Sequence, residues 1–222
     1  MNIRKLKKGD EKQILKLDRL VETHRWNRRN LKNWYWKYNG NNPFGKAMIW
    51  VAEENKKVVA TVSAIPLDYN INGKTVKGSC SIAMIVHPTY QNKGLIKFVA
   101  DKLFEDAKFN KIKFIYGYPN QNAYQIHKKF FSYEDVSVQK MFYKKIKKNI
   151  SILRKRNFDF IEVKKFPNEI NKFLLRVRNQ HKVYLKRNLN FLNWRYIERP
   201  DYKYKVFIVK KEKKIFGYFV LK

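Results

Sequence analysis

Apolar and polar residues follow two different periods along the first two thirds of the chain, and each period predicts a different kind of element. Alternation of apolar and polar residues, or a short apolar run between turn residues, predicts strands; the segments are 2–6, 48–52, 57–66, 77–86, 113–118 and 136–143. Apolar residues that recur every third or fourth position predict helices with one buried face; these begin at Asp10 and near residues 27, 93 and 123. The order is therefore strand, two helices, three strands, helix, strand, helix and strand.

Turn residues indicate how the three consecutive strands connect. Asn72-Gly73 is a strong signal for a tight hairpin turn, Glu54-Asn55 marks a second turn, and Pro88 ends the third strand. Strands joined by such short turns are antiparallel, and helices interrupt the strands on either side of them. The pattern predicts an α/β domain of the α+β kind, with a mixed sheet, over residues 1–146.

The rest of the chain looks like a second start of the same domain. Residues 193–196 (Asn-Trp-Arg-Tyr) match residues 35–38 (Tyr-Trp-Lys-Tyr), and residues 207–216 match residues 50–59. Both matches have an offset of about 157 residues, as an internal repeat requires. The second copy reaches Lys222 without an equivalent of residues 75–143. We therefore expect a partial, non-catalytic second unit over residues 147–222.

Tryptophans occupy matched positions in the two copies. Trp34, Trp36 and Trp194 are predicted to pack in the core at helix ends. The alternative is a platform on which bases or sugars stack.

The composition is that of a folded protein. Of its residues, 44% are hydrophobic and 16% aromatic, which excludes a disordered chain. No apolar run reaches the ~18 residues of a membrane span, and no apolar stretch follows the first residues as in a signal peptide. Cys80 is the single cysteine, which excludes an internal disulfide framework and a zinc site with several cysteines. These features favour a cytoplasmic protein without a metal ion.

Positive charge dominates the sequence. Lys and Arg number 50 against 18 Asp and Glu, a net charge of +32. One interpretation is a polyanionic partner such as a nucleic acid. The other is a bias toward A- and T-rich codons, since Lys, Asn, Ile, Tyr and Phe are all abundant and the basic residues are spread along the chain. Either way, we expect non-specific binding to polyanions at low salt.

One segment carries a candidate chemistry. Residues 86–96 (Val-His-Pro-Thr-Tyr-Gln-Asn-Lys-Gly-Leu-Ile) lead from the end of a strand into a helix that begins at Gly94. Such a turn directs backbone N–H groups and the positive end of the helix dipole at one point, and glycine lets a ligand approach the backbone closely. The segment therefore predicts either a pyrophosphate site or an ordinary strand–helix turn.

This segment resembles motif A of the GNAT superfamily of N-acetyltransferases. Gln91, Asn92, Lys93, Gly94 and Leu95 match the motif, whereas Ile96 stands where glycine or alanine is usual and takes room beside the pyrophosphate. The preceding Val-His-Pro-x-Tyr, the hairpin at residues 71–74 and the element order over residues 1–143 are also typical of the superfamily. The resemblance implies that the pantetheine arm of acetyl-CoA lies along Met84, Ile85 and Val86.

A second region of resemblance follows the fifth strand. Asn120 and Ala123 match the family pattern Asn-x-x-Ala, and Asn120 is a further expected cofactor residue. In the family a tyrosine four residues after the alanine often protonates the departing thiolate. His127 occupies that position here and is the first candidate for this role; Tyr124 is the second.

The general base is not evident from the sequence. Glu53 and Glu54 lie at a predicted turn and are expected to be solvated, and Asp68 is a weak candidate. Cys80 is expected to be a buried structural thiol, with a covalent acyl carrier as the alternative.

The leading hypothesis is an acetyl-CoA-dependent N-acetyltransferase that acts on a primary amine. The resemblance implies amino sugars or other cell-envelope precursors as candidate acceptors, and a homodimer is left open. Two alternatives remain. One is a tRNA-dependent aminoacyltransferase of the peptidoglycan-bridge type, which also has two GNAT-like units. The other is a non-catalytic basic module for nucleic acid or acidic polymers, in which side chains block the CoA cleft.

Overall fold

The structure is a computed structural model that describes residues 1–21, 30–39, 42–138, 140, 142, 158–178 and 181–222. The first unit contains, in chain order, β1 (Asn2–Lys5), α1 (Asp10–Val21), α2 (Leu31–Tyr38), β2 (Met48–Glu54), β3 (Lys57–Ile71), β4 (Lys74–Val86), η2 (Pro88–Tyr90), α3 (Leu95–Phe109), β5 (Phe114–Tyr116) and α4 (Gln121–Phe131). The second unit contains β6 (Asp159–Val163), α5 (Ile170–Arg178), β7 (Val183–Leu185), α6 (Leu189–Leu192), η3 (Asn193–Ile197), β8 (Lys205–Lys211) and β9 (Lys214–Leu221).

The first unit is built on a mixed sheet with the order β1-β2-β3-β4-β5. Neighbouring strands are antiparallel except for β4 and β5, which are parallel. The turns at Asn55-Lys56 and Asn72-Gly73 have positive φ at both residues, the geometry that tight hairpins require. The predicted α/β fold with a mixed sheet is therefore confirmed.

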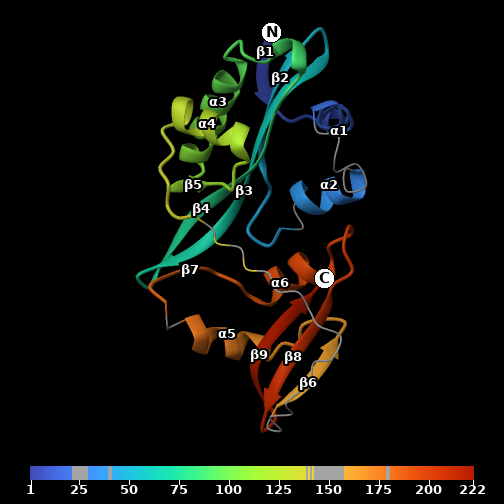
Figure 1. Cartoon of the computed structure of the whole chain (residues 1–222), viewed down its shortest axis with the longest axis vertical. Helices are drawn as coiled ribbons and strands as arrows, with labels where there is room; N and C mark the ends of the chain where they lie inside the picture. The colour runs from blue at the N-terminus through green and yellow to red at the C-terminus, as the bar shows by residue number, and fades with distance from the viewer. Residues whose placement is uncertain (22–29, 40–41, 139, 141, 143–157, 179–180) are drawn as a thin grey trace.

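Helices cover both faces of this sheet. Figure 1 shows α3 and α4 on one side and α1 and α2 on the other. Alternate residues of β2 and β3 point to opposite faces. One core cluster accordingly contains Ala52, Ala60 and α3 residues such as Val99, and the other contains Ile49, Val51 and the α1 residue Leu17. The sheet is thus buried on both sides, and its β4–β5 edge is left for a ligand.

The predicted strand at residues 136–143 is wrong for the residues that the structure describes. Val136, Val138 and Phe142 belong to no strand and are 87–93% exposed; positions 139, 141 and 143 lie outside the described residues. Alternation favours a strand only where a neighbouring strand supplies hydrogen bonds. The adjacent β5 pairs over three residues and does not provide such an edge here.

The second unit repeats, in β6, β8 and β9, the way β1, β2 and β3 pair in the first unit. The pairs Asn2↔Glu53 and Asp159↔Lys210 are equivalent at an offset of about 157 residues. Strand β9 likewise pairs with β8 as β3 pairs with β2, and the bulge at Ala52/Glu53 recurs at Val209/Lys210. Sheet register is fixed by turn geometry and by the buried face. The likeness between the copies is therefore structural and not a chance match of letters.

The two units meet through their matched tryptophans. The Trp36 Nε1–H donates to the Trp194 carbonyl at 2.9 Å, and the Trp194 Nε1–H donates to the Trp36 carbonyl at 3.2 Å. Their rings stack with centroids 5.1 Å apart, and both side chains are buried. The predicted core role of these tryptophans is thereby observed. The exchanged hydrogen bonds give this contact a local two-fold relation.

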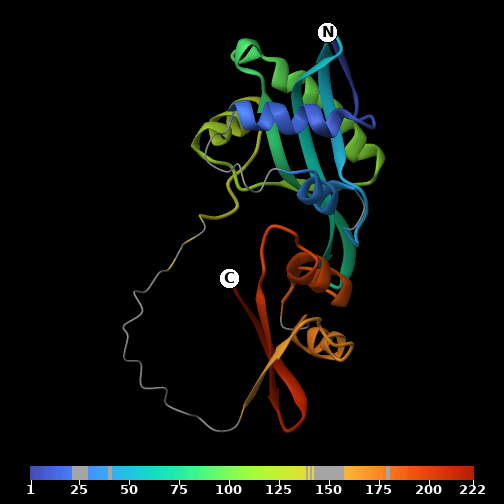
Figure 2. The same ribbon diagram turned by 90° about the vertical axis from the view of Figure 1, so that its right-hand side faces the viewer.

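A strand of the second unit also completes the first sheet. Strand β7 pairs with Tyr69–Ile71 at the end of β3, beyond the last residue that pairs with β2. Figure 2 shows the second unit at the end of the sheet toward which the long β3–β4 hairpin extends. The interface thus combines backbone pairing with a shared apolar cluster that contains Trp36, Ile65, Phe166 and Trp194.

Replacing Trp36 or Trp194 with alanine should lower the free energy of unfolding by about 3–5 kcal/mol, the usual cost of removing a large buried aromatic side chain. Because each indole donates to the other residue, the two losses should be similar. The double variant should lose less than the sum, since the pair shares one contact. Urea denaturation checks this, and strictly additive losses would contradict the shared contact.

No helix in the described part of the chain is both long and apolar enough to cross a membrane.

Candidate functional site

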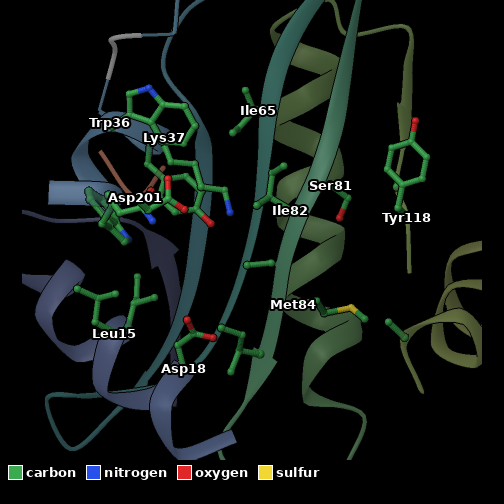
Figure 3. A pocket seen from close by; sticks show the side chains of 18 of the residues that line it. Leu15, Asp18, Trp36, Lys37, Ile65, Ser81, Ile82, Met84, Tyr118 and Asp201 are labelled. Carbon is green, nitrogen blue, oxygen red and sulfur yellow. The ribbon is translucent and has the colours of Figure 1, made fainter. Parts of the chain in front are cut away.

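A cavity of about 1050 Å³ lies between the β4 edge of the sheet, the helices α1 and α2, and the second unit. Figure 3 shows side chains that line it. Leu15, Asp18 and Lys37 lie on one side of β4, and Ser81, Met84 and Tyr118 lie on the other. The cavity therefore extends past the edge of β4, from the loop after β5 to the two early helices.

The edge of β4 is open where it faces this cavity. Strands β4 and β5 pair only as far as Cys80 and Tyr116, whereas β4 continues to Val86. The His87 N–H donates to the Val59 carbonyl of β3 at 2.8 Å. Since backbone groups alternate along a strand, those of Met84 and Val86 point away from β3, toward the open edge. An extended ligand can therefore pair with this strand by backbone hydrogen bonds.

A bulge changes the direction of β4 in the same region. Ser63 pairs with Ala83 and Ala64 pairs with Ser81, which leaves Ile82 as the extra residue. A bulge bends its strand and increases the local twist. It lies at the point where β4 and β5 separate, and both changes open the edge to the cavity.

The loop between β4 and α3, which we call the anion cradle, has backbone N–H groups that are free to bind a ligand. Asn92 and Gly94 have φ values of 61° and 72°, and Gly94 is the N-cap of α3. Within the described residues, the N–H groups from Asn92 to Ile96 donate to no protein acceptor. A Cβ at Gly94 would meet no heavy atom within 4 Å. Free N–H groups, open space and the positive end of a helix dipole are the features that phosphate binding at a helix N-terminus requires.

Side chains of the loop support this cradle and do not enter it. The Gln91 Nε2–H donates to the Val86 carbonyl at 3.1 Å, which ties the loop to the end of β4. Leu95 and Ile96 are each 7% exposed and belong to the core under α3. The expectation that Ile96 takes room beside the phosphate is therefore wrong, because its side chain is buried in the core. Lys93 is exposed, with its ammonium 5.7 Å from the Tyr90 ring centroid.

Among the described residues, His127 is the histidine that lines the cavity. Asn120 is the N-cap of α4, and its side-chain oxygen accepts a hydrogen bond from the Ala123 N–H at 2.9 Å. The Asn-x-x-Ala pattern is therefore a helix N-cap in this structure. One turn further, His127 is 7% exposed and packs against Tyr133 with ring centroids 4.7 Å apart. Burial lowers the pKa of His127, which favours the neutral form of its imidazole.

Comparison with known proteins decides the family. The sequence matches the Acetyltransferase (GNAT) domain over residues 2–133, more than half of the chain. The chain belongs to the GNAT acetyltransferase family. Among curated proteins no match was found.

Solved structures share the GNAT fold at low sequence identity. A conserved protein from Enterococcus faecalis V583, described as a probable N-acyltransferase, is 13% identical with a TM-score of 0.67; the match covers 100% of this chain and 55% of that one. AAC(6')-Iy in complex with the bisubstrate analogue CoA-S-monomethyl-acetylneamine is 13% identical with a TM-score of 0.51, over 65% of this chain and 97% of that one. A transcriptional regulator from Bacillus halodurans C-125 is 13% identical with a TM-score of 0.50, and the match covers 64% of this chain and 99% of that one. The first match includes both units, and this chain spans about half of its length.

Tyr124, the second candidate for proton transfer, does not line the cavity. The Tyr124 hydroxyl donates to the Asp135 Oδ2 at 2.9 Å, and the Lys128 ammonium binds the same oxygen at 3.2 Å. The bond to Asp135 raises the pKa of Tyr124. Tyr124 is therefore held in a surface network, and we assign it no proton transfer.

The acids considered from the sequence also lie elsewhere in the GNAT domain. Glu53 binds Arg4 and Glu54 accepts from the Tyr90 hydroxyl, while Asp68 lies opposite Lys77 in the β3–β4 hairpin. None of the three lines the cavity. Asp18 of α1 does, with its carboxylate directed into it (Figure 3). Sequence reasoning missed Asp18 because it looked for acids on the strands, although the helical period already placed Leu17 in the core beside it.

Cys80 has the surroundings of a structural thiol. It is half-buried at the edge of the shared apolar cluster, and its Sγ lies 3.6 Å from the Ser81 carbonyl oxygen. Burial raises the pKa of the Cys80 thiol, which keeps it protonated and a poor nucleophile. Elsewhere in the described residues, no three His, Cys, Asp or Glu side chains are grouped so that they could hold a metal ion.

The second unit contributes to the wall of the GNAT cavity. Trp194, Arg195, Arg199 and Asp201 all line it. The one sequence feature that could have pointed to these residues is the internal repeat. Arg195 is the match of Lys37, and Lys37 also lines the cavity.

Proposed function

We propose that this protein is an acetyl-CoA-dependent N-acetyltransferase that acylates a primary amine in the cavity described above. The observation that carries the proposal is the continuity of two binding features. The free N–H groups at the start of α3 directly follow the open edge of β4. Acetyl-CoA combines a pyrophosphate with an extended pantetheine arm and an acyl thioester, so it fits both features in the order in which they occur.

The residues of the first unit then have distinct roles. The N–H groups from Asn92 to Ile96 bind the pyrophosphate, with Lys93 adding charge at the rim and Gln91 bracing the loop. The backbone of Met84 and Val86 pairs with the pantetheine arm beside Ile85. One of these two N–H groups donates to the thioester oxygen and stabilises the charge that develops there. The Asn120 amide lies at the same wall of the cavity.

His127 is the residue that we propose for proton transfer. A primary amine is mostly protonated at neutral pH, so it must lose one proton to solvent before it attacks the thioester and a second proton as the amide forms. A neutral imidazole can accept this second proton and then give it to the departing thiolate, which leaves as the CoA thiol. The lowered pKa of His127 supports the first step, and it disfavours the role as a resident acid that the sequence suggested.

The second unit has no described equivalent of the anion cradle, and we propose it as non-catalytic. We keep the division into residues 1–146 and 147–222 as part of this proposal; the boundary itself lies outside the described residues. Amino sugars and other cell-envelope precursors are candidate acceptors, and the half-buried single cysteine fits a reducing cytoplasm.

One alternative from the sequence loses its physical basis. A non-catalytic basic module requires a CoA cleft that is blocked by apolar side chains. The Ile96 side chain is in the core, and the space at Gly94 is open. The described residues give no observation that favours the alternative over the transferase, and the basic segment 144–156 lies outside them.

Calorimetric titration with acetyl-CoA at two salt concentrations tests the proposal, with ATP and tRNA as controls. Salt is varied because a net charge of +32 attracts any polyanion, and screening removes that attraction. Saturable one-site binding that survives moderate salt and is not matched by ATP is expected. Binding that disappears with salt, or that tRNA matches, would overturn the acetyl-CoA site and favour a tRNA-dependent reaction.

A further inference from the structure

Two cations at matched positions of the repeat line the part of the cavity that faces α2 and the second unit. Lys37 belongs to α2, and Arg195 belongs to η3 of the second unit. Each follows a tryptophan of the stacked pair, and each lies over the ring of the next tyrosine. The Lys37 ammonium is 4.9 Å from the Tyr38 ring centroid, and the Arg195 guanidinium is 5.5 Å from that of Tyr196. The contact between the tryptophans thus brings one cation from each unit to a single cavity.

Neither cation has an acidic partner among the described residues. The Arg195 Nη1 is in addition buried without any hydrogen-bond partner. A buried guanidinium nitrogen without an acceptor is costly, since water and protein both fail to satisfy it.

Arg199, a third cation of the cavity lining, differs from Lys37 and Arg195 because it has an acidic partner. Arg199 binds Asp201 through its Nε at 2.6 Å and its Nη2 at 2.8 Å, and it stacks over Trp36. Its charge is therefore neutralised within the second unit. Asp18, the other acid of the lining, is itself engaged in an interaction. The charge left over in the cavity is positive.

The geometry points to a site for an anionic group of the acceptor, held by Lys37 and Arg195. This inference rests on the proposed acetyl transfer and names its substrate class: a primary amine that also carries a phosphate or a carboxylate. Arg195 offers two hydrogen bonds in the fork geometry that suits both anions, and Lys37 adds a point charge. The second unit then selects the acceptor, although it takes no part in the chemistry.

The matched comparison is between amines that differ only in charge. Glucosamine 6-phosphate is compared with glucosamine, and glycylglycine is compared with glycylglycinamide, by release of free CoA thiol and by calorimetry on the protein saturated with CoA. A preference for glucosamine 6-phosphate would identify phosphate as the anion, and a preference for glycylglycine would identify a carboxylate. Equal use or equal binding of both members in both pairs would overturn the inference.

Variants locate the site. Arg195→Gln should weaken binding and raise the KM of the preferred anionic amine by roughly ten- to hundredfold, the range expected for lost hydrogen bonds to a charged group, with little change for its neutral counterpart. Lys37→Gln should act in the same direction with a smaller effect. Arg178→Gln and Lys172→Gln, which remove the same charges from exposed positions of α5, should change neither.

The result separates the two proposals. If Arg195→Gln behaves like Arg178→Gln, the preference for the anionic amine arises from the net charge of the protein. The anion site at Lys37 and Arg195 is then wrong, even where acetyl-CoA binds normally. If acetyl-CoA itself fails to bind the unaltered protein, the proposed function falls first. Acetyl-CoA affinity of Arg195→Gln should stay within twofold of the unaltered protein, because the residue lies in the second unit and outside the cradle at α3.

Discussion

Replacing Gly94 with valine should abolish measurable binding of acetyl-CoA while the protein stays folded. Gly94 has a φ of 72° and caps α3 next to the free N–H groups of the loop. A Cβ there meets no protein atom within 4 Å, so the branched side chain would occupy the space that we assign to the pyrophosphate. Steric exclusion of this kind should weaken binding at least a hundredfold, and calorimetry checks it.

The strain of the same substitution can be separated from its effect on the ligand. A β-branched residue at positive φ costs about 1–3 kcal/mol, so the melting temperature should fall by several degrees. Gly73→Val provides the matched control, because Gly73 has a φ of 84° with nothing within 4 Å of its Cβ position, in the β3–β4 hairpin turn. Both variants should lose stability, and only Gly94→Val should lose acetyl-CoA. Normal binding by Gly94→Val would show that the cradle is not the cofactor site.

Replacing His127 with glutamine should lower kcat about 10²- to 10⁴-fold, the range over which a positioned proton-transfer group contributes. The affinity for acetyl-CoA should change little, because His127 lies on α4 at the wall of the cavity and not in the loop before α3. Glutamine keeps much of the volume that packs against Tyr133. Rapid-quench or thiol-release kinetics with separate calorimetry distinguish the two quantities.

The pH profile adds a test that a merely structural role would not pass. Burial lowers the pKa of His127, so kcat/KM should stay high through neutral pH and fall only below the ordinary histidine value of about 6.5. The His127→Gln variant should lose this decrease in kcat/KM at low pH, which we call the acid limb. Tyr124→Phe should keep both the rate and the limb, since Tyr124 binds Asp135 outside the cavity. A preserved limb in His127→Gln would assign the proton transfer to another group.

Stability should depend on the same protonation. The pKa of His127 is lower in the folded state than in the unfolded state, so below about pH 6.5 the unfolded chain binds more protons and is favoured. The stabilising contribution of neutral His127 is therefore complete above that pH and decreases as the pH falls toward the folded-state pKa.

Local chemistry made much of the fold predictable. Asn72 and Gly73 adopt positive φ values, which asparagine and glycine tolerate better than other residues. The fourfold spacing of Val99 and Leu103 places both on the buried face of α3. The conformation of the loop before α3 was predictable for the same reason, since it depends on one glycine and a helix start. The failure at residues 136–143 is different in kind, because whether an alternating segment becomes a strand depends on a partner edge that local pattern does not contain.

The candidate site was less predictable where it depends on distant segments. The Ile96 side chain could be judged an obstacle only while its direction was unknown, and α3 turns it into the core. Asp18 and Arg195 reach the cavity from α1 and from the second unit. Their position follows from tertiary contacts such as the exchanged bonds of Trp36 and Trp194, which no short motif encodes.

The apolar cluster between the units has a consequence for how the molecule unfolds. It joins Trp36, Ile65 and Leu67 of the first unit to Phe166, Leu192 and Trp194 of the second. Neither unit can open this cluster without exposing apolar surface of the other, so heat should melt both in one cooperative transition. A ligand bound only at α3 stabilises whatever unfolds together with it. Acetyl-CoA should therefore protect even the amides of β8 and β9 against hydrogen exchange, although it touches neither strand.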